Sequence, residues 1–266
     1  MWHRSDKNHA IGVWGAILHS PLPEPVLDGY AFPNGADPKL FAGLDPAALH
    51  GQDRFVVLHM TGLFDICWHL RGFESYMADM AGDEDFAAKL MDCALAYSLD
   101  FVNQIPAGVD GVRVGEDWGV QKGLIMGPRL WRKFLKPRLN MLYAAIRQKG
   151  LRVMIHSCGD IAEIMPDLIE LGVEVVHPVQ PEAMDVGFLQ REYGRDLILY
   201  GALGSQSTLV YGSPEDIVAE ARDRLALFQD GGYILGPAGA IPTDARPETV
   251  IALTDFAMGL NAGGAL

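Results

Sequence analysis

The chain has 266 residues, of which 49% are hydrophobic and 21% are charged, a globular balance that argues against disorder. This length suits one large domain, such as an α/β barrel, or two small ones. The formal net charge of −13 argues against DNA, RNA and anionic membranes as partners, because the composition offers nothing to offset phosphate repulsion.

The cysteines and the start of the chain indicate where the protein works. The three cysteines, Cys67, Cys93 and Cys158, are odd in number and far apart, so they predict a reducing compartment and no disulfide framework. No apolar run is long enough to span a bilayer, and residues 1–15 lack the apolar core of a signal peptide. We therefore expect a cytoplasmic protein, with residues 1–50 as an irregular lead-in.

Short apolar runs alternate with helical patterns between residues 51 and 260. The runs are almost continuously apolar, as strands covered on both faces must be. They predict six strands, over residues 55–60, 111–114, 151–157, 173–178, 197–203 and 233–237.

The helices between these runs carry clear signals. Residues 84–104 place apolar side chains on one helical face. Residues 128–149 predict a second helix with a kink at Pro137. Ser213 is a typical N-cap, and the helix that follows it is predicted to end at Gly231-Gly232.

Strand–helix–strand units in series predict parallel strands joined by right-handed crossovers. A closed barrel of this kind needs eight strands, and six are found. No GxGxxG motif follows the first strand, so a dinucleotide-binding sheet is disfavoured. The prediction is an α/β fold of the (β/α)₈ TIM-barrel type, a single domain over 1–266 that is incomplete at its N-terminus, with the first strand missing.

His156 and Cys158 lie at the end of the predicted strand 151–157. Residues two apart face the same side of a strand, and the C-terminal strand ends line the functional mouth of such a barrel. Alone, a buried histidine or cysteine is more often structural. As a pair, imidazole and thiolate suit Zn²⁺, and Glu182, beyond the next strand, could supply a third ligand or remain a solvated loop carboxylate.

Other polar residues follow the predicted strands. Repeated around a barrel, such residues build a site, although any one of them could be a helix cap or part of a loop. Asp117 and His59 are the predicted catalytic groups, with capping as the alternative for Asp117. The predicted substrate-binding residues, with a core position as the alternative for Trp118, are Gln121, Trp118, Gln180, His177 and Gln206.

Most of the chain from residue 55 onward resembles the uroporphyrinogen decarboxylase superfamily, especially its branch of cobalamin-dependent methyltransferases. The resemblance implies a (β/α)₈ barrel, in agreement with the strand–helix pattern, and the usual N-terminal segment and first strand of the family are absent. The stretches that carry it are residues 62–81, 109–139, 153–185, 199–217 and 231–253.

The resemblance also implies a zinc site. In the methyltransferase branch an H-x-C pair binds zinc, which holds a thiol for attack on a cobalamin-bound methyl group, and His156 and Cys158 match this pair. The third ligand of that branch is a cysteine near the last strand. Residues 236–240 read GPAGA here, so Glu182 would have to substitute, or no catalytic metal is held.

Three hypotheses about function follow. The first is a metal-assisted methyltransferase-like enzyme, with zinc, a small substrate and a corrinoid protein as partner. The second is a uroporphyrinogen decarboxylase that releases CO₂ from a porphyrinogen, for which Asp117 is the nearest substitute for the family's catalytic aspartate. The third is a non-catalytic barrel paralogue, whose unpaired strand edges predict an obligate partner or a homodimer. The substrate and the methyl donor and acceptor stay open.

Overall fold

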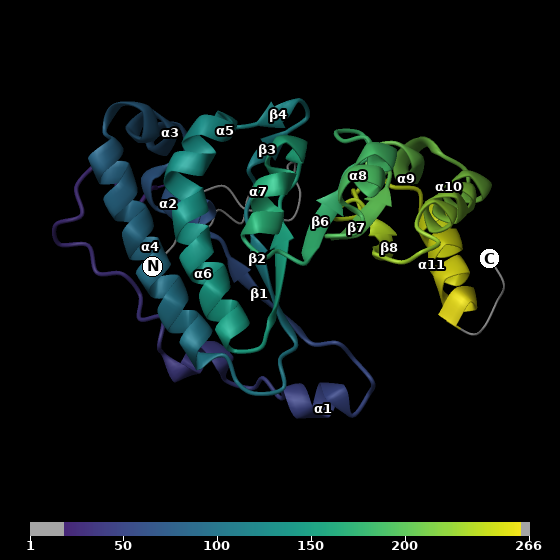
Figure 1. Cartoon of the computed structure of the whole chain (residues 1–266), viewed down its shortest axis with the longest axis horizontal. Coiled ribbons are helices and arrows are strands. Elements are labelled where there is room, and N and C mark those ends of the chain that lie inside the picture. Colours follow the sequence, from purple (N-terminus) through teal and green to yellow (C-terminus); the bar gives the residue numbers. More distant parts are fainter. Residues whose placement is uncertain (1–18, 262–266) are drawn as a thin grey trace. The chain divides into compact units, whose positions relative to one another are not determined.

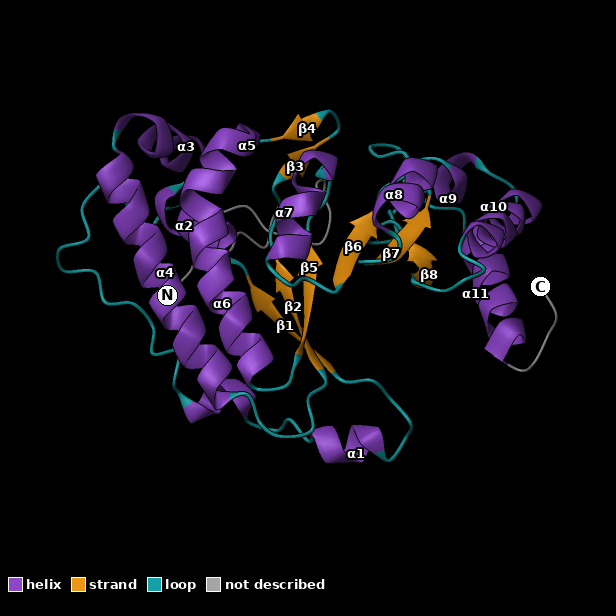
Figure 2. Cartoon of the chain, viewed as in Figure 1, coloured by secondary structure: helices purple, strands orange, loops and turns teal. Residues whose placement is uncertain are grey.

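A computed structural model of the chain describes residues 19–261 as an α/β protein (Figures 1 and 2). Its six-stranded sheet has the order β1-β2-β5-β6-β7-β8, and a two-stranded sheet contains β3 and β4. The six predicted strands are confirmed as β1 (Val57–Thr61), β2 (Gly111–Gly115), β5 (Arg152–His156), β6 (Val175–Val179), β7 (Ile198–Leu203) and β8 (Tyr233–Pro237). The predicted fold class is thus confirmed, an α/β fold of the TIM-barrel type.

Two compact units make up the chain. Of the described residues, unit 1 contains 19–117, 126–155 and 170–173, and unit 2 contains 118–125, 156–169 and 174–261. The start of the predicted lead-in, residues 1–18, lies outside the described residues. Within the described range, no helix is long and apolar enough to cross a membrane.

Unit 1 pairs β1 with β2 in parallel, from Val57 opposite Gly111 to Thr61 opposite Gly115. Of its longer helices, α4 contacts α2, α3 and α6, and α4 and α6 lie side by side (Figure 1). These helices bury the apolar core of the unit. The helical elements of unit 1 are a 3-10 turn (Pro38–Phe41), α1 (Pro46–His50), α2 (Leu63–Arg71), α3 (Phe73–Gly82), α4 (Glu84–Gln104), α5 (Gly127–Leu130), a π-helical turn (Trp131–Leu135) and α6 (Lys136–Gln148).

The predicted helix over 84–104 is confirmed as α4, and its N-cap Asp83 accepts a hydrogen bond from the Phe86 backbone N–H. The predicted helix over 128–149 is confirmed in extent, since helical residues run continuously from Gly127 to Gln148, and the irregularity next to Pro137 is a π-helical turn. This segment forms α5, a π-helical turn and α6 in succession. Pro137 lies in the first turn of α6 and lacks the N–H that would continue the ladder, so the wider π-turn accommodates the break.

Unit 2 is built on β6, β7 and β8, which pair in parallel, and every residue of β6 is buried. One apolar cluster lies between β7 and the helices α10 and α11, and it includes Leu209, Ile217 and Leu253. The remaining elements are the strands β3 (Gly119–Val120) and β4 (Gly123–Leu124), a 3-10 turn (Ala162–Ile164), and the helices α7 (Met165–Glu170), which continues into unit 1, α8 (Val186–Tyr193), α9 (Thr208–Tyr211), α10 (Pro214–Leu227) and α11 (Pro247–Asn261).

The predicted cap of α10 is confirmed. Ser213 and Asp216 form a capping box, in which each side chain accepts a hydrogen bond from the other residue's backbone N–H. The helix ends earlier than predicted, because the chain leaves the helical conformation at Phe228 rather than at Gly231-Gly232.

Candidate metal centre

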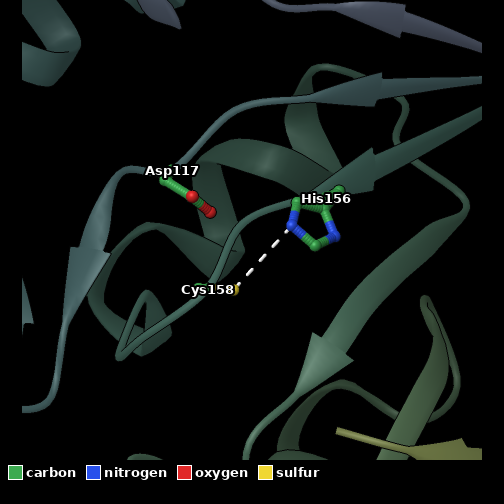
Figure 3. Close-up of side chains that lie close together, drawn as sticks. All are labelled: Asp117, His156 and Cys158. Carbon is green, nitrogen blue, oxygen red and sulfur yellow. Dashed lines mark hydrogen bonds between the residues drawn. The ribbon is translucent and has the colours of Figure 1, made fainter. Parts of the chain in front are cut away.

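His156 ends β5, and Cys158 follows in the loop after it. The structure brings the two side chains together, with His156 Nε2 3.8 Å from Cys158 Sγ (Figure 3). Both residues are half-buried. Gly159, with a φ of +78°, turns the chain away immediately afterwards, a conformation that favours glycine.

The β3–β4 hairpin and β6 hold this loop in place. Buried Ser157 donates its backbone N–H to the His177 carbonyl oxygen (2.8 Å), and its Oγ accepts the backbone N–H of Trp118 (3.0 Å). A Cβ atom added to Gly119 would lie 2.6 Å from the Cys158 carbonyl oxygen. The hairpin therefore approaches the backbone of Cys158 so closely that a side chain at residue 119 has no room.

Asp117 joins His156 and Cys158 in a three-residue group. The Asp117 side chain is exposed, and the next residue, Trp118, donates its backbone N–H to Ser157 Oγ. One ligand atom from each of the three residues lies within 4.8 Å of the other two (Figure 3). Asp117 thus occupies the position in this group for which the sequence suggested Glu182.

Glu182 is engaged elsewhere. Its Oε1 accepts hydrogen bonds from the Gln206 backbone N–H (2.9 Å) and the Ser207 hydroxyl (2.8 Å). Its Oε2 is buried and has no hydrogen-bond partner among the described residues. The carboxylate therefore binds the loop after β7 and does not belong to the group around His156.

The donor atoms of this group fit a zinc ion. Imidazole nitrogen, thiolate sulfur and carboxylate oxygen are the donors that zinc binds in proteins. Tetrahedral angles and ordinary Zn–N and Zn–S lengths put these two ligand atoms about 3.6 Å apart, and the distance from His156 Nε2 to Cys158 Sγ is 3.8 Å. Three protein ligands would leave the fourth position open, as in catalytic zinc sites.

The other nitrogen of His156 faces a second histidine. His156 Nδ1 lies 2.8 Å from Nδ1 of His177, which is on β6 and 8% exposed. The His177 ring packs against the Tyr200 ring of β7, with 4.5 Å between the ring centroids. Sequence reasoning placed His177 among the substrate-binding residues, but no sequence signal pairs it with His156.

The three predicted substrate-binding glutamines have partners within unit 2. Gln121 Nε2 donates to Gln206 Oε1 (3.1 Å), which connects the β3–β4 hairpin to the loop after β7. Gln180 is buried, and its Oε1 accepts the Gly159 backbone N–H. Trp118 is 1% exposed and lies in the core, the alternative considered for it.

His59 lies on β1, in unit 1, and is not a member of the metal-ligand group. Its Nδ1 accepts a hydrogen bond from Arg113 Nε (3.3 Å). Burial and the charge of Arg113 lower the pKa of His59, which favours its neutral form. Its predicted catalytic role stays a prediction.

Two carboxylates of unit 1, Asp65 and Glu116, are not among the predicted catalytic, substrate-binding or metal-binding residues. Asp65, in the first turn of α2, accepts a hydrogen bond from Trp68 Nε1 (2.9 Å). Burial, with a smaller contribution from the negative charge of Asp117, raises the pKa of Asp65 to about 6. Glu116 is 1% exposed and accepts the backbone N–H groups of two α2 residues, Leu63 and Phe64. In the sequence, both carboxylates follow predicted strands, over residues 55–60 and 111–114.

Comparison with known proteins places the chain among relatives. The sequence model described as "Uroporphyrinogen decarboxylase (URO-D)" matches residues 55–259. Two curated proteins named uroporphyrinogen decarboxylase are similar to this chain. The one from Geobacillus kaustophilus (strain HTA426) is 26% identical over 172 residues, and the one from Geobacillus thermodenitrificans (strain NG80-2) is 25% identical over 170 residues. Each match covers 63% of this chain and 46% of the relative, so the chain spans about half the length of the curated relatives it matches.

A solved structure described as a methyltransferase from Methanosarcina mazei has a similar fold. The TM-score is 0.72, and the match covers 93% of this chain and 73% of that chain. At 23% sequence identity the likeness concerns the fold alone.

Proposed function

The chain belongs to the uroporphyrinogen decarboxylase (URO-D) family, and from this premise we propose that it is a metal-assisted, methyltransferase-like enzyme. It would move a methyl group between a small substrate and a thiol or corrinoid, with a corrinoid protein as partner. The observation that carries the proposal is the group of Asp117, His156 and Cys158, with one ligand atom of each within 4.8 Å of the others. The fold shared with the Methanosarcina mazei methyltransferase supports it.

The three side chains divide the work of holding a zinc ion. His156 would bind through Nε2, the nitrogen that faces Cys158. Thiolate and carboxylate each carry one negative charge, so Cys158 and Asp117 together balance the double charge of the ion. Zinc at such a site lowers the pKa of a substrate thiol, so that thiolate is available at neutral pH.

The surroundings keep these ligands in place. Gln180 holds the turn at Gly159, and the hydrogen bond from Trp118 to Ser157 fixes the chain next to Asp117. Positioned donors reduce the entropy that a metal site loses when the ion binds, which is why supporting residues matter for affinity. Gln121 and Gln206, bonded to each other in unit 2, are the proposed substrate contacts.

Zinc analysis of matched variants tests the metal site. The protein is stripped with a chelator, reloaded with zinc, dialysed and analysed for metal by mass spectrometry. We expect about one zinc per chain in the wild type and in Glu182→Gln, since Glu182 lies outside the group. His156→Ala and Cys158→Ser should lose the ion. Equal zinc content in the wild type and in both of these variants would rule out the site.

Methyl transfer is then measured from methylcobalamin to a small thiol, with the cobalamin spectrum as readout. Activity should require zinc and should fall strongly in Cys158→Ser. Zinc binding without methyl transfer to any thiol tested would keep the metal site and reject the reaction.

The names of the curated relatives favour one alternative, decarboxylation of uroporphyrinogen. That reaction would need no metal, and a carboxylate such as Asp117 would stabilise the positive charge that develops on the pyrrole as CO₂ leaves. Release of CO₂ from uroporphyrinogen by the chelated protein, lost in Asp117→Asn, would replace the methyltransferase proposal.

A further inference from the structure

We infer that His177 is a positioning residue of the proposed metal centre: its Nδ1 accepts a hydrogen bond from His156 Nδ1–H, so that the lone pair of His156 Nε2 is directed toward Cys158, where the ion would bind. The inference rests on the proposed function, because it assigns His177 a task at that same site. It is carried by the two contacts of the His156 ring, one from each nitrogen.

The contact between the rings couples the proton positions of the two imidazoles. The two Nδ1 atoms lie 2.8 Å apart, which is a hydrogen-bond distance, so one nitrogen carries a hydrogen and the other accepts it. A neutral imidazole has a single N–H. If His156 donates from Nδ1, its Nε2 presents a lone pair toward Cys158. If His177 donates instead, His156 carries its hydrogen on Nε2 and cannot bind a metal ion there.

The same distance argues against His177 as a further metal ligand. Two nitrogens bound to one tetrahedral zinc ion lie about 3.3 Å apart, which is longer than the 2.8 Å found between the rings. His156 also presents different nitrogens to its two neighbours, Nδ1 to His177 and Nε2 to Cys158. The pair therefore has the geometry of a ligand and its supporting acceptor, an arrangement that fixes the orientation of metal-bound histidines.

His177 is well held for this task. It lies on β6, where all residues are buried, and the Tyr200 ring covers one side of its imidazole. Its backbone carbonyl accepts the N–H of Ser157, so the same residue is attached to the loop through both main chain and side chain. A change of the side chain alone should leave the backbone contact intact and release only the His156 ring.

Two substitutions separate the hydrogen bond from packing. His177→Leu keeps a side chain of similar size but removes the hydrogen-bond acceptor. His177→Asn keeps an acceptor oxygen close to the position of Nδ1. Leu209→Ala is the control for general destabilisation, because Leu209 lies in the buried cluster beside α10 and α11, apart from the histidines. Zinc affinity is measured by competition with a chromophoric chelator, and cobalt(II) absorption reports the ligand geometry.

We expect His177→Leu to bind zinc 10–100-fold more weakly, the usual range for loss of such a supporting partner. His177→Asn should regain most of the affinity, and Leu209→Ala should lose stability but keep wild-type affinity. Affinity in His177→Leu equal to that of the wild type would overturn the inference while leaving the metal site standing.

Nitrogen-15 NMR of the histidine rings tests the inference without relying on zinc. In the metal-free wild type, His156 should carry its hydrogen on Nδ1, and this preference should disappear in His177→Leu. A wild-type protein that binds no zinc would refute the proposed function, and the ring spectra would still decide the role of His177. A hydrogen on Nε2 of His156 in the wild type would overturn the inference.

Discussion

Replacing Glu116 by glutamine should destabilise unit 1. The Glu116 carboxylate is 1% exposed and accepts two backbone N–H groups at the start of α2, Oε1 from Leu63 (3.0 Å) and Oε2 from Phe64 (2.9 Å). Glutamine keeps one acceptor oxygen and turns an NH₂ group toward the second N–H, so one buried donor loses its partner. The negative charge that favours the positive end of the helix is lost as well.

The magnitude follows from these contacts. A hydrogen bond to a charged group contributes about 1.5–3 kcal/mol, and the helix dipole adds up to about 1 kcal/mol. We therefore expect Glu116→Gln to lower the free energy of unfolding by about 2–4 kcal/mol. Gly62, the N-cap of α2, is consistent with this tight fit, because a Cβ there would lie 1.7 Å from Glu116 Cγ.

Urea unfolding followed by far-UV circular dichroism measures this loss. Glu248→Gln is the matched control, because Glu248 also lies in the first turn of a helix, α11, but is exposed. It should unfold like the wild type, since its exposed ion pair with Arg246 (3.1 Å) contributes little to stability. If Glu116→Gln were as stable as this control, the hydrogen bonds of the Glu116 carboxylate to the first turn of α2 would not stabilise unit 1.

Two further changes test the surroundings of the site. Asp65→Asn should stabilise the chelated protein at pH 7.5 by up to roughly 3 kcal/mol, because a pKa raised from 3.8 to about 6 means that folding penalises the charged carboxylate. This penalty is complete above pH 6 and vanishes as the pH falls below about 4. A gain in stability that persists undiminished at low pH would contradict the reasoning. Gly119→Ala should lower the melting temperature and weaken zinc binding, since the Cβ of the alanine would lie 2.6 Å from the Cys158 carbonyl oxygen. Gly82→Ala is the control, because a Cβ at residue 82 meets no atom within 4 Å. Equal melting temperatures of the two variants would show that the hairpin can shift.

The sequence predicted the strands well because each one is a compact apolar run bounded by turn residues. Helix α4 and the Ser213 cap were equally predictable from the sequence, since hydrophobic periodicity and capping residues are local signals. The π-helical turn before Pro137 was missed, because the sequence indicates where a proline breaks the helical ladder but not how the backbone absorbs the break.

The site was only partly predictable for a different reason. His156 and Cys158 are two residues apart at the end of a predicted strand, so side-chain alternation predicted that they face the same side, although Cys158 itself lies in the loop after β5. Asp117 and Glu182 both follow strand ends, and long-range hydrogen bonds decide which of the two lies beside His156 and Cys158. Next to Asp117, the Trp118 backbone N–H donates to Ser157, whereas Glu182 accepts hydrogen bonds from the loop after β7. Such contacts leave no periodic trace in the sequence.

X-ray absorption spectroscopy of the zinc-loaded protein tests most directly whether Asp117, His156 and Cys158 hold a metal ion. The account predicts one sulfur at about 2.3 Å and nitrogen and oxygen ligands at about 2.0–2.2 Å, with the sulfur signal absent in Cys158→Ser. A zinc ion surrounded only by nitrogen and oxygen in the wild type, or a sulfur signal that persists in Cys158→Ser, would contradict it.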